Sequence, residues 1–248
     1  MRQILLKIKY LGTAYHGWQV QDNAVSVQER LQDALEIIFG SRLDVTGCSR
    51  TDAGVHANEY CCTIKVDSDV DCFKLQGGLN ANLPDDISVF DVSFVDLDFH
   101  PRYSCKGKQY IYKIWNSAAP DPFLFGRALH YKPALDEKLL DACAKDFVGT
   151  HDFSALSGAK CDVSDTTRTI FDASVTRDGD LVTFSVTGDG FLYNMVRIMV
   201  GTLLFINEGK LEKNSIPEIL NSKDRTKAGR TAPASGLYLN KVFYGGEL

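Results

Sequence analysis

Apolar and polar residues alternate along the chain with two different periods. Runs in which every second residue is apolar predict strands, and longer runs with apolar residues at helical intervals predict helices. The predicted strands cover residues 4–10, 43–48, 60–66, 87–95, 104–116, 169–176 and 181–187, with a last strand beginning at residue 236. The predicted helices cover residues 27–39, 71–79, 134–147 and 194–207, and a small polar loop covers residues 157–165. Both halves of the chain therefore mix strands with helices.

Two of these helices are unusually well marked. Ser26 and Glu29 have capping-box spacing before the helix over 27–39, and Gly40 follows its last apolar position. The helix over 194–207 is apolar nearly all round, which predicts a buried helix, and Arg197 is its only charge. Losing the partner of a buried ion pair costs about 3–5 kcal/mol. Arg197 therefore needs either a carboxylate or a set of backbone carbonyls.

The strands predicted over 43–48 and 60–66 flank an eleven-residue loop, residues 47–57. This loop carries the carboxylate of Asp52 beside the guanidinium of Arg50, and Gly54 adds backbone freedom. Asp52 can be a reactive group, or its side chain can cap a turn through the local backbone. His56 is close in sequence, but no second His or Cys stands at ligand spacing, so no metal site is predicted.

Charge and composition restrict how this protein could bind nucleic acid. The chain has 32 acidic and 27 basic residues, so any RNA contact must be local. Lys223, Arg225, Lys227 and Arg230 form one basic segment, which either holds phosphates or is a solvated loop.

The cysteines and the apolar segments indicate where the protein works. Seven cysteines without zinc-binding or CxxC spacing fit reduced thiols in a cytoplasmic protein. The N-terminus lacks the apolar block of a signal peptide. The most apolar tract, residues 195–206, is shorter than the roughly 20 residues of a membrane span. We therefore expect no membrane role.

The run from Arg50 to Ala57, Arg-Thr-Asp-Ala-Gly-Val-His-Ala, closely resembles the signature of the tRNA pseudouridine synthase A family. Ser49 departs from it, since the family more often has Gly there, and we expect this to alter loop flexibility rather than chemistry. The resemblance continues in family order through residues 15–19, 80–84, 99–102, 110–112, 194–197 and 236–239, so it spans nearly the full chain.

This resemblance implies an α+β pseudouridine synthase fold. That fold has a mainly antiparallel or mixed central sheet flanked by helices, in two similar α/β halves with the active-site cleft between them. The polar stretch at residues 98–102 is our expected boundary, which divides the chain into residues 1–103 and 104–248.

The resemblance also implies a reaction and its residues. The family isomerises uridine to pseudouridine at positions 38, 39 or 40 of the tRNA anticodon arm, as a homodimer and without cofactor or metal. By resemblance Asp52 is the nucleophile, Arg197 is its ion-pair partner, and Tyr110 stacks on the uracil and abstracts or relays a proton. The expected substrate-binding residues are Arg50, Thr51, Leu237, Lys223, Arg225 and Arg230.

Other interpretations remain open from the residues alone. Tyr110 can be an ordinary sheet tyrosine, and Arg50 a surface phosphate contact without a role in extruding the nucleotide. The whole chain can be a catalytically silent RNA-binding or folding module, or a metal-dependent phosphodiesterase, since several loops are acidic. The residues also leave open whether Asp52 attacks the ribose or the uracil ring, or initiates an elimination.

Overall fold

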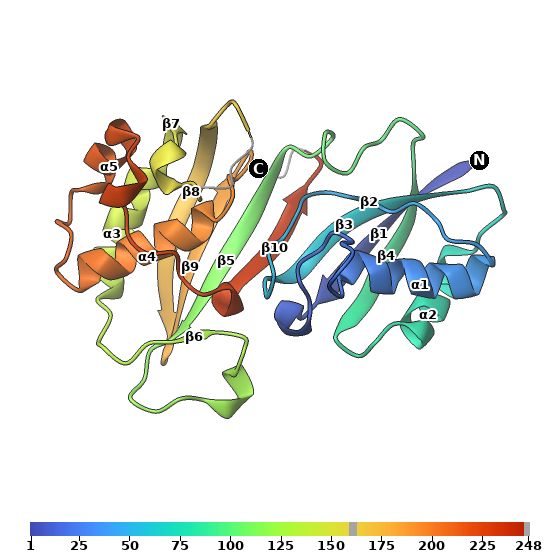
Figure 1. Cartoon of the computed structure of the whole chain (residues 1–248), viewed down its shortest axis with the longest axis horizontal. Coiled ribbons are helices and arrows are strands. Elements are labelled where there is room, and N and C mark those ends of the chain that lie inside the picture. Colours follow the sequence, from blue (N-terminus) through green and yellow to red (C-terminus); the bar gives the residue numbers. More distant parts are fainter. Residues whose placement is uncertain (159–162, 246–248) are drawn as a thin grey trace. The chain divides into compact units, whose positions relative to one another are not determined.

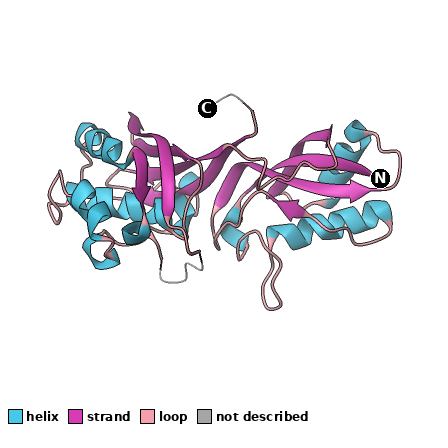
Figure 2. Cartoon of the chain, turned by 90° about the horizontal axis from the view of Figure 1, so that it is seen from above, coloured by secondary structure: helices cyan, strands magenta, loops and turns pink. Residues whose placement is uncertain are grey.

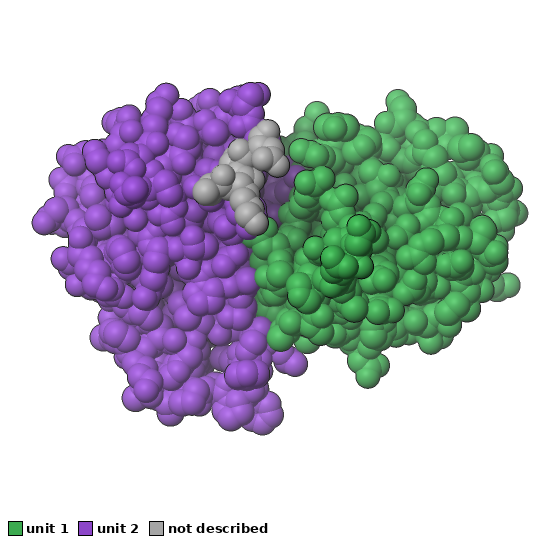
Figure 3. Space-filling view, viewed as in Figure 1, with its two compact units in different colours: residues 1–106, 238–248 green, residues 107–237 purple. Residues whose placement is uncertain are grey.

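The computed structural model describes residues 1–158 and 163–245, and the chain forms two compact units. One unit comprises residues 1–106 and 238–248, and the other comprises residues 107–237 (Figure 3). Within the predicted polar loop at 157–165, residues 159–162 lie outside the described residues. Residues 238–243 of the last strand belong to the first unit, where Tyr238 and Leu239 pair with His56 and Ala57.

The first unit is a mixed sheet with two α-helices (Figure 1). The strand order is β4-β1-β3-β10, with β2 also on β3. Only the pairing of β10 with β3, at Tyr238 and His56, is parallel among these. The helices contact each other, and α2 packs along β4. The elements are β1 (Arg2–Tyr10), α1 (Val27–Phe39), β2 (Thr46–Gly47), β3 (His56–Val66), α2 (Cys72–Asn82), β4 (Ile87–Val95) and β10 (Leu237–Phe243).

The strands of the second unit lie in the order β5-β9-β8-β7, with β6 parallel to the end of β5. Helix α3 packs on β8 and on α4. Figure 2 shows the helices of the chain in cyan and its strands in magenta. Helix α4 is buried along nearly its whole length, as its composition predicts. The elements are β5 (Gly107–Trp115), β6 (Leu129–His130), α3 (Glu137–Ala144), β7 (Gly149–Asp152), β8 (Thr167–Asp178), β9 (Leu181–Gly188), α4 (Met195–Asn207) and α5 (Ile216–Ser222).

Most predicted elements are confirmed, and the differences occur at their ends. The strand predicted over 43–48 is reduced to β2, and β3 begins at His56 rather than at residue 60. Helix α2 continues to Asn82, and Leu83, the residue before Pro84, is extended as proline requires. Helix α3 begins only after Asp136, whose side chain accepts a hydrogen bond from the Leu139 N–H.

The length and hydrophobicity of each described helix decide whether it could cross a membrane. None of those within residues 1–158 and 163–245 combines the length and the hydrophobicity that crossing a bilayer requires.

The capping box of α1 generates a stability prediction. The Ser26 side chain accepts a hydrogen bond from the Glu29 N–H at 3.2 Å, and the Glu29 carboxylate accepts from the Ser26 N–H at 3.4 Å. Ser26→Ala removes one of these bonds and should lower the free energy of unfolding by about 1 kcal/mol. Urea unfolding measures this. Ser41→Ala, at an exposed position beyond the helix, serves as control, and equal stability of the two variants would contradict the prediction.

Candidate active site

The loop that carries Asp52 joins β2 to β3 and comprises residues 48–55. Its side chains differ sharply in exposure: Arg50 and Ala53 are exposed, Asp52 is half-buried, and Thr51 is 9% exposed. A half-buried carboxylate beside an exposed guanidinium lies where a polar substrate can reach both.

Hydrogen bonds from the first unit fix this loop on both sides of Asp52. Before it, the Tyr60 hydroxyl donates to the Ser49 carbonyl. At Thr51, the side-chain hydroxyl bonds to the Tyr10 hydroxyl at 2.9 Å, and the carbonyl accepts from the Trp18 N–H at 3.2 Å. After Asp52, the Gly54 N–H donates to the Tyr15 carbonyl at 3.1 Å. The backbone around the carboxylate is therefore held in one conformation.

The aromatic segment 15–19 packs against the Asp52 loop. Trp18 is 3% exposed and its indole stacks on the Tyr60 ring, with centroids 4.0 Å apart. Gly17 has a φ of 93°, and a Cβ there would lie 2.3 Å from the Thr51 carbonyl oxygen. Only glycine permits this approach. Trp18 is thus an internal support and not a surface for stacking a base.

His56 is likewise packed inside the first unit. It is fully buried, its Nδ1 accepts a hydrogen bond from the Gly12 N–H at 2.9 Å, and its ring stacks on Tyr238 with centroids 4.6 Å apart. Across the described residues, no three His, Cys, Asp or Glu side chains gather as metal ligands.

Arg197, in the second unit, lies near the start of α4 and is half-buried. Its Nε donates to the Ala232 carbonyl at 2.7 Å, and its Nη1 donates to the Asn194 side-chain oxygen at 2.8 Å. The Ala232 N–H in turn donates to the Arg197 carbonyl at 3.0 Å. One backbone carbonyl and one side-chain oxygen therefore accept hydrogen bonds from this guanidinium, and the two bonds fix its plane.

The segment 229–233, whose Ala232 carbonyl accepts one of these bonds, packs directly on α4. A Cβ on Gly201 would lie 1.6 Å from the Arg230 carbonyl oxygen, so the backbones touch at a position where only glycine fits. The Gly229 N–H donates to the Thr202 hydroxyl at 3.0 Å. The Tyr112 hydroxyl donates to the Pro233 carbonyl at 2.8 Å. This packing determines where Arg197 points.

Tyr110 and Leu237 are the two expected pocket residues of the second unit. Tyr110 lies on β5 opposite Val186, is 8% exposed, and meets the Phe191 ring edge-on with centroids 5.0 Å apart. Leu237 begins β10 and is 6% exposed. Neither Phe191 nor Asn194 is predicted as a support, because their roles depend on contacts with Tyr110 and Arg197 that no local sequence pattern shows.

Most cations of the basic segment, residues 223–230, already have partners within the protein. Lys223 pairs with Asp152 at 2.9 Å, and Arg230 pairs with Glu208 at 3.4 Å. Arg225 donates to the Gly229 carbonyl at 2.9 Å, and burial lowers the pKa of its guanidinium. Arg225 thus shapes its own loop. Lys223 and Arg230 are exposed, so a phosphate could replace the carboxylates with which they pair.

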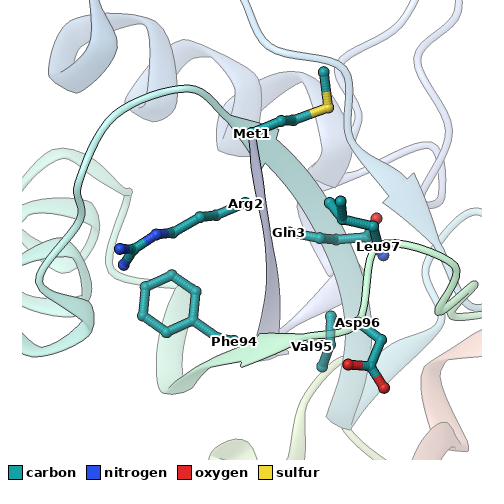
Figure 4. Close-up of a pocket in the computed structure, with 7 residues that line it drawn as sticks. All are labelled: Met1, Arg2, Gln3, Phe94, Val95, Asp96 and Leu97. Atoms are coloured by element: carbon teal, nitrogen blue, oxygen red, sulfur yellow. The ribbon is translucent and has the colours of Figure 1, made fainter.

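A pocket of about 360 Å³ lies elsewhere in the first unit (Figure 4). It contains none of the predicted site residues. Its lining is Met1, Arg2, Gln3, Phe94, Val95, Asp96 and Leu97.

Comparison with known proteins places this chain in a family. A family model described as tRNA pseudouridine synthase matches residues 7–104 and 143–245. The tRNA pseudouridine synthase A of Acetivibrio thermocellus is 45% identical over 98% of this chain and 100% of that protein. The proteins of the same name from Ruminiclostridium cellulolyticum and Clostridium acetobutylicum are each 44% identical, over 98% of this chain and 100% of theirs.

One solved structure, titled "Crystal Structure of a Cbf5-Nop10-Gar1 Complex", aligns with 84% of this chain and 54% of that chain. The TM-score is 0.35 at 10% identity, which is too remote to support an argument.

The enzyme class that the close matches define is the pseudouridine synthases. Within that class, the chain belongs to the tRNA pseudouridine synthase A family. The predicted resemblance and the α+β fold class are thereby confirmed.

The close approach of Gly17 to the Asp52 loop generates a second prediction. Gly17→Ala combines a strained positive φ with a clash against the Thr51 carbonyl, and should destabilise the protein by at least about 2 kcal/mol. Thermal unfolding measures this. Gly77→Ala is the matched control, because nothing lies within 4 Å of its Cβ and alanine favours the exposed interior of α2. A Gly17→Ala protein as stable as wild type would contradict the described packing.

Proposed function

We propose that this protein isomerises uridine to pseudouridine in tRNA, at positions 38, 39 or 40 of the anticodon arm, with Asp52 as nucleophile and without a cofactor. The observation that carries the proposal is the half-buried carboxylate of Asp52 on a loop fixed at Ser49, Thr51 and Gly54. Relatives named tRNA pseudouridine synthase A, 44–45% identical over nearly the whole chain, support the choice of substrate.

The reaction breaks the glycosidic bond, turns the uracil, rejoins it through carbon 5 and removes the proton from that carbon. Substrate and product are isomers, so neither an electron nor a group has to be supplied. Asp52 would attack the ribose or the uracil ring, or would initiate an elimination. In each case the carboxylate must be ionised and correctly oriented, and the fixed loop provides the orientation.

Arg197 is proposed to keep Asp52 ionised. Desolvation by a bound uridine would raise the pKa of a carboxyl group, and a neighbouring guanidinium opposes that rise. The bonds from Nε to Ala232 and from Nη1 to Asn194 set the orientation of the Arg197 guanidinium. A planar, oriented guanidinium is suited to bind a carboxylate through two hydrogen bonds.

Tyr110 and Leu237 are proposed to form the wall against which the uracil lies. Both are more than nine-tenths buried, and the edge-on contact with Phe191 holds the Tyr110 ring. Tyr110 would also take the proton from carbon 5, directly or through a relay.

The target uridine must leave its stack before it can react, at a cost of a few kcal/mol. Arg50 is proposed to occupy the space that the extruded nucleotide leaves, because it is exposed and two residues from Asp52. Thr51 is proposed to contribute to substrate binding from the same loop.

Binding of tRNA is proposed to use local cations on a homodimer in the cytoplasm. The formal net charge of −5 argues against binding through bulk charge, but two subunits can combine their basic segments. Lys223 and Arg230 would exchange Asp152 and Glu208 for phosphates, while Arg225 shapes the segment. Binding that relies on such contacts weakens as salt rises.

Substitution of Asp52 tests the proposed function. Asp52→Asn keeps the size of the side chain but removes its negative charge, so turnover should fall below detection while tRNA affinity stays within about twofold of wild type. The measurement is release of label from tRNA that carries tritium at uridine carbon 5, together with filter binding of the same tRNA.

The outcomes separate the competing functions. Full activity in Asp52→Asn would remove this carboxylate from the mechanism. A wild-type protein that binds tRNA without releasing label would instead be the silent binding module, and label release that stops in chelator would favour metal-dependent chemistry.

A further inference from the structure

The segment that joins β4 to β5 contains a turn, His100–Ser104, that is rigid and at the same time exposed. The Ser104 N–H donates to the His100 carbonyl at 2.8 Å, and the His100 N–H donates to the Ser104 hydroxyl at 3.1 Å. The His100 Nδ1 accepts from the backbone N–H groups of Arg102 and Tyr103, at 3.1 and 3.3 Å. The turn, part of the green segment after β4 in Figure 1, is thus closed by its own hydrogen bonds.

Two further contacts anchor the turn to the sheet of the first unit. The Gln3 side chain at the start of β1 donates to the Phe99 carbonyl, and the Tyr244 hydroxyl donates to the Pro101 carbonyl at 2.8 Å. The Phe99 and Tyr244 rings also pack, with centroids 4.9 Å apart. Phe99 is thus half-buried against Tyr244, whereas the side chains of residues 102 and 103 face solvent.

The Tyr103 side chain is largely exposed and does not contribute to the core. Three quarters of its surface (75%) is open to solvent, although its ring lies 4.3 Å from that of His100, centroid to centroid. The Arg102 guanidinium lies 5.8 Å from the Tyr103 ring centroid. An aromatic ring and a guanidinium held side by side on a fixed turn can stack on a base and bind its phosphate together.

Among the described residues, the charge of Arg102 is not neutralised by a carboxylate, unlike that of several other arginines on the surface. Several exposed arginines are neutralised by carboxylates: Arg2 by Asp69, Arg42 by Asp33 and Glu36, and Arg230 by Glu208. Within the described part of the chain, the Arg102 guanidinium pairs with no carboxylate, although Asp96 and Asp98 precede it on the same segment. These two carboxylates would repel a long phosphate track, so the contact suits a single nucleotide.

The turn is remote from the Asp52 loop within the first unit. Gln3, which bonds to Phe99, and Tyr10, which bonds to Thr51, stand at opposite ends of β1. Seven strand residues span about 23 Å. A contact at the turn would therefore reach a nucleotide well away from the uridine that reacts.

We propose that Arg102 and Tyr103 form a second RNA contact, which binds one unpaired nucleotide of the substrate, with the base on Tyr103 and its phosphate on Arg102. The inference rests on the proposed function, because that function supplies the RNA. It adds a site that binds the substrate without taking part in the chemistry.

The test measures filter binding of full-length tRNA transcript across a salt series for three proteins: wild type, Arg102→Gln and Tyr103→Ala. Loss of a base stack should weaken binding by roughly fivefold or more in Tyr103→Ala, with the salt slope unchanged. Loss of one phosphate contact should lower the salt slope by about one in Arg102→Gln. Pseudouridine formation at saturating tRNA should stay at the wild-type rate in both variants.

Matched controls are available on the same unit. Phe73→Ala removes an aromatic side chain that is 85% exposed, and Arg42→Gln removes an arginine already paired with carboxylates, so both should bind tRNA as wild type does. Wild-type affinity and salt slope in Arg102→Gln and Tyr103→Ala would overturn the inference, as would equal losses in the controls. Failure of the proposed function shows separately, as wild-type protein that forms no pseudouridine.

Discussion

The structure depends on the conformation of one short loop. Four aromatic residues hold the Asp52 loop in place through hydrogen bonds. Two of these bonds are made to Thr51, the residue directly before Asp52: its hydroxyl bonds to the Tyr10 hydroxyl, and its carbonyl accepts from the backbone N–H of Trp18. A carboxylate on a mobile loop would have to be ordered again in every reaction cycle, at a cost in entropy. Here folding itself bears that cost, and glycine at position 17 makes the close packing feasible.

The second unit solves a similar problem with different means. A half-buried guanidinium near the start of an apolar helix needs hydrogen-bond acceptors. A neighbouring segment provides one of them, the Ala232 carbonyl. That segment reaches the helix because Gly201 and Gly229 let the two backbones touch. Arg197 is therefore oriented by backbone packing at Ala232 together with the side-chain oxygen of Asn194. The same segment carries Arg230, so the substrate binding proposed for Arg230 and the orientation of Arg197 would be physically linked.

The sequence predicted the elements better than it predicted their supports. Periodicity located α1 and α4, and the motif around Asp52 identified the family, because both signals are local. The start of β3 at His56 was missed, since that residue is paired with Tyr238 on a strand nearly two hundred residues away. Tyr10 was recognised only as an apolar position of β1, and no local pattern indicates that its hydroxyl meets Thr51. Charge alone groups Arg225 with Lys223 and Arg230, whereas in the fold its half-buried guanidinium bonds within its own loop.

The central claim is that the fixed loop orients Asp52 for the chemical step. A double-mutant cycle of Tyr10→Phe and Thr51→Val, followed by the single-turnover rate of pseudouridine formation at saturating tRNA, tests it most directly. Because the two hydroxyls bond to each other, each single variant should slow the chemical step several-fold, and the double variant should be no slower than the worse single one. Wild-type rates in both single variants, or losses that multiply in the double variant, would contradict the account.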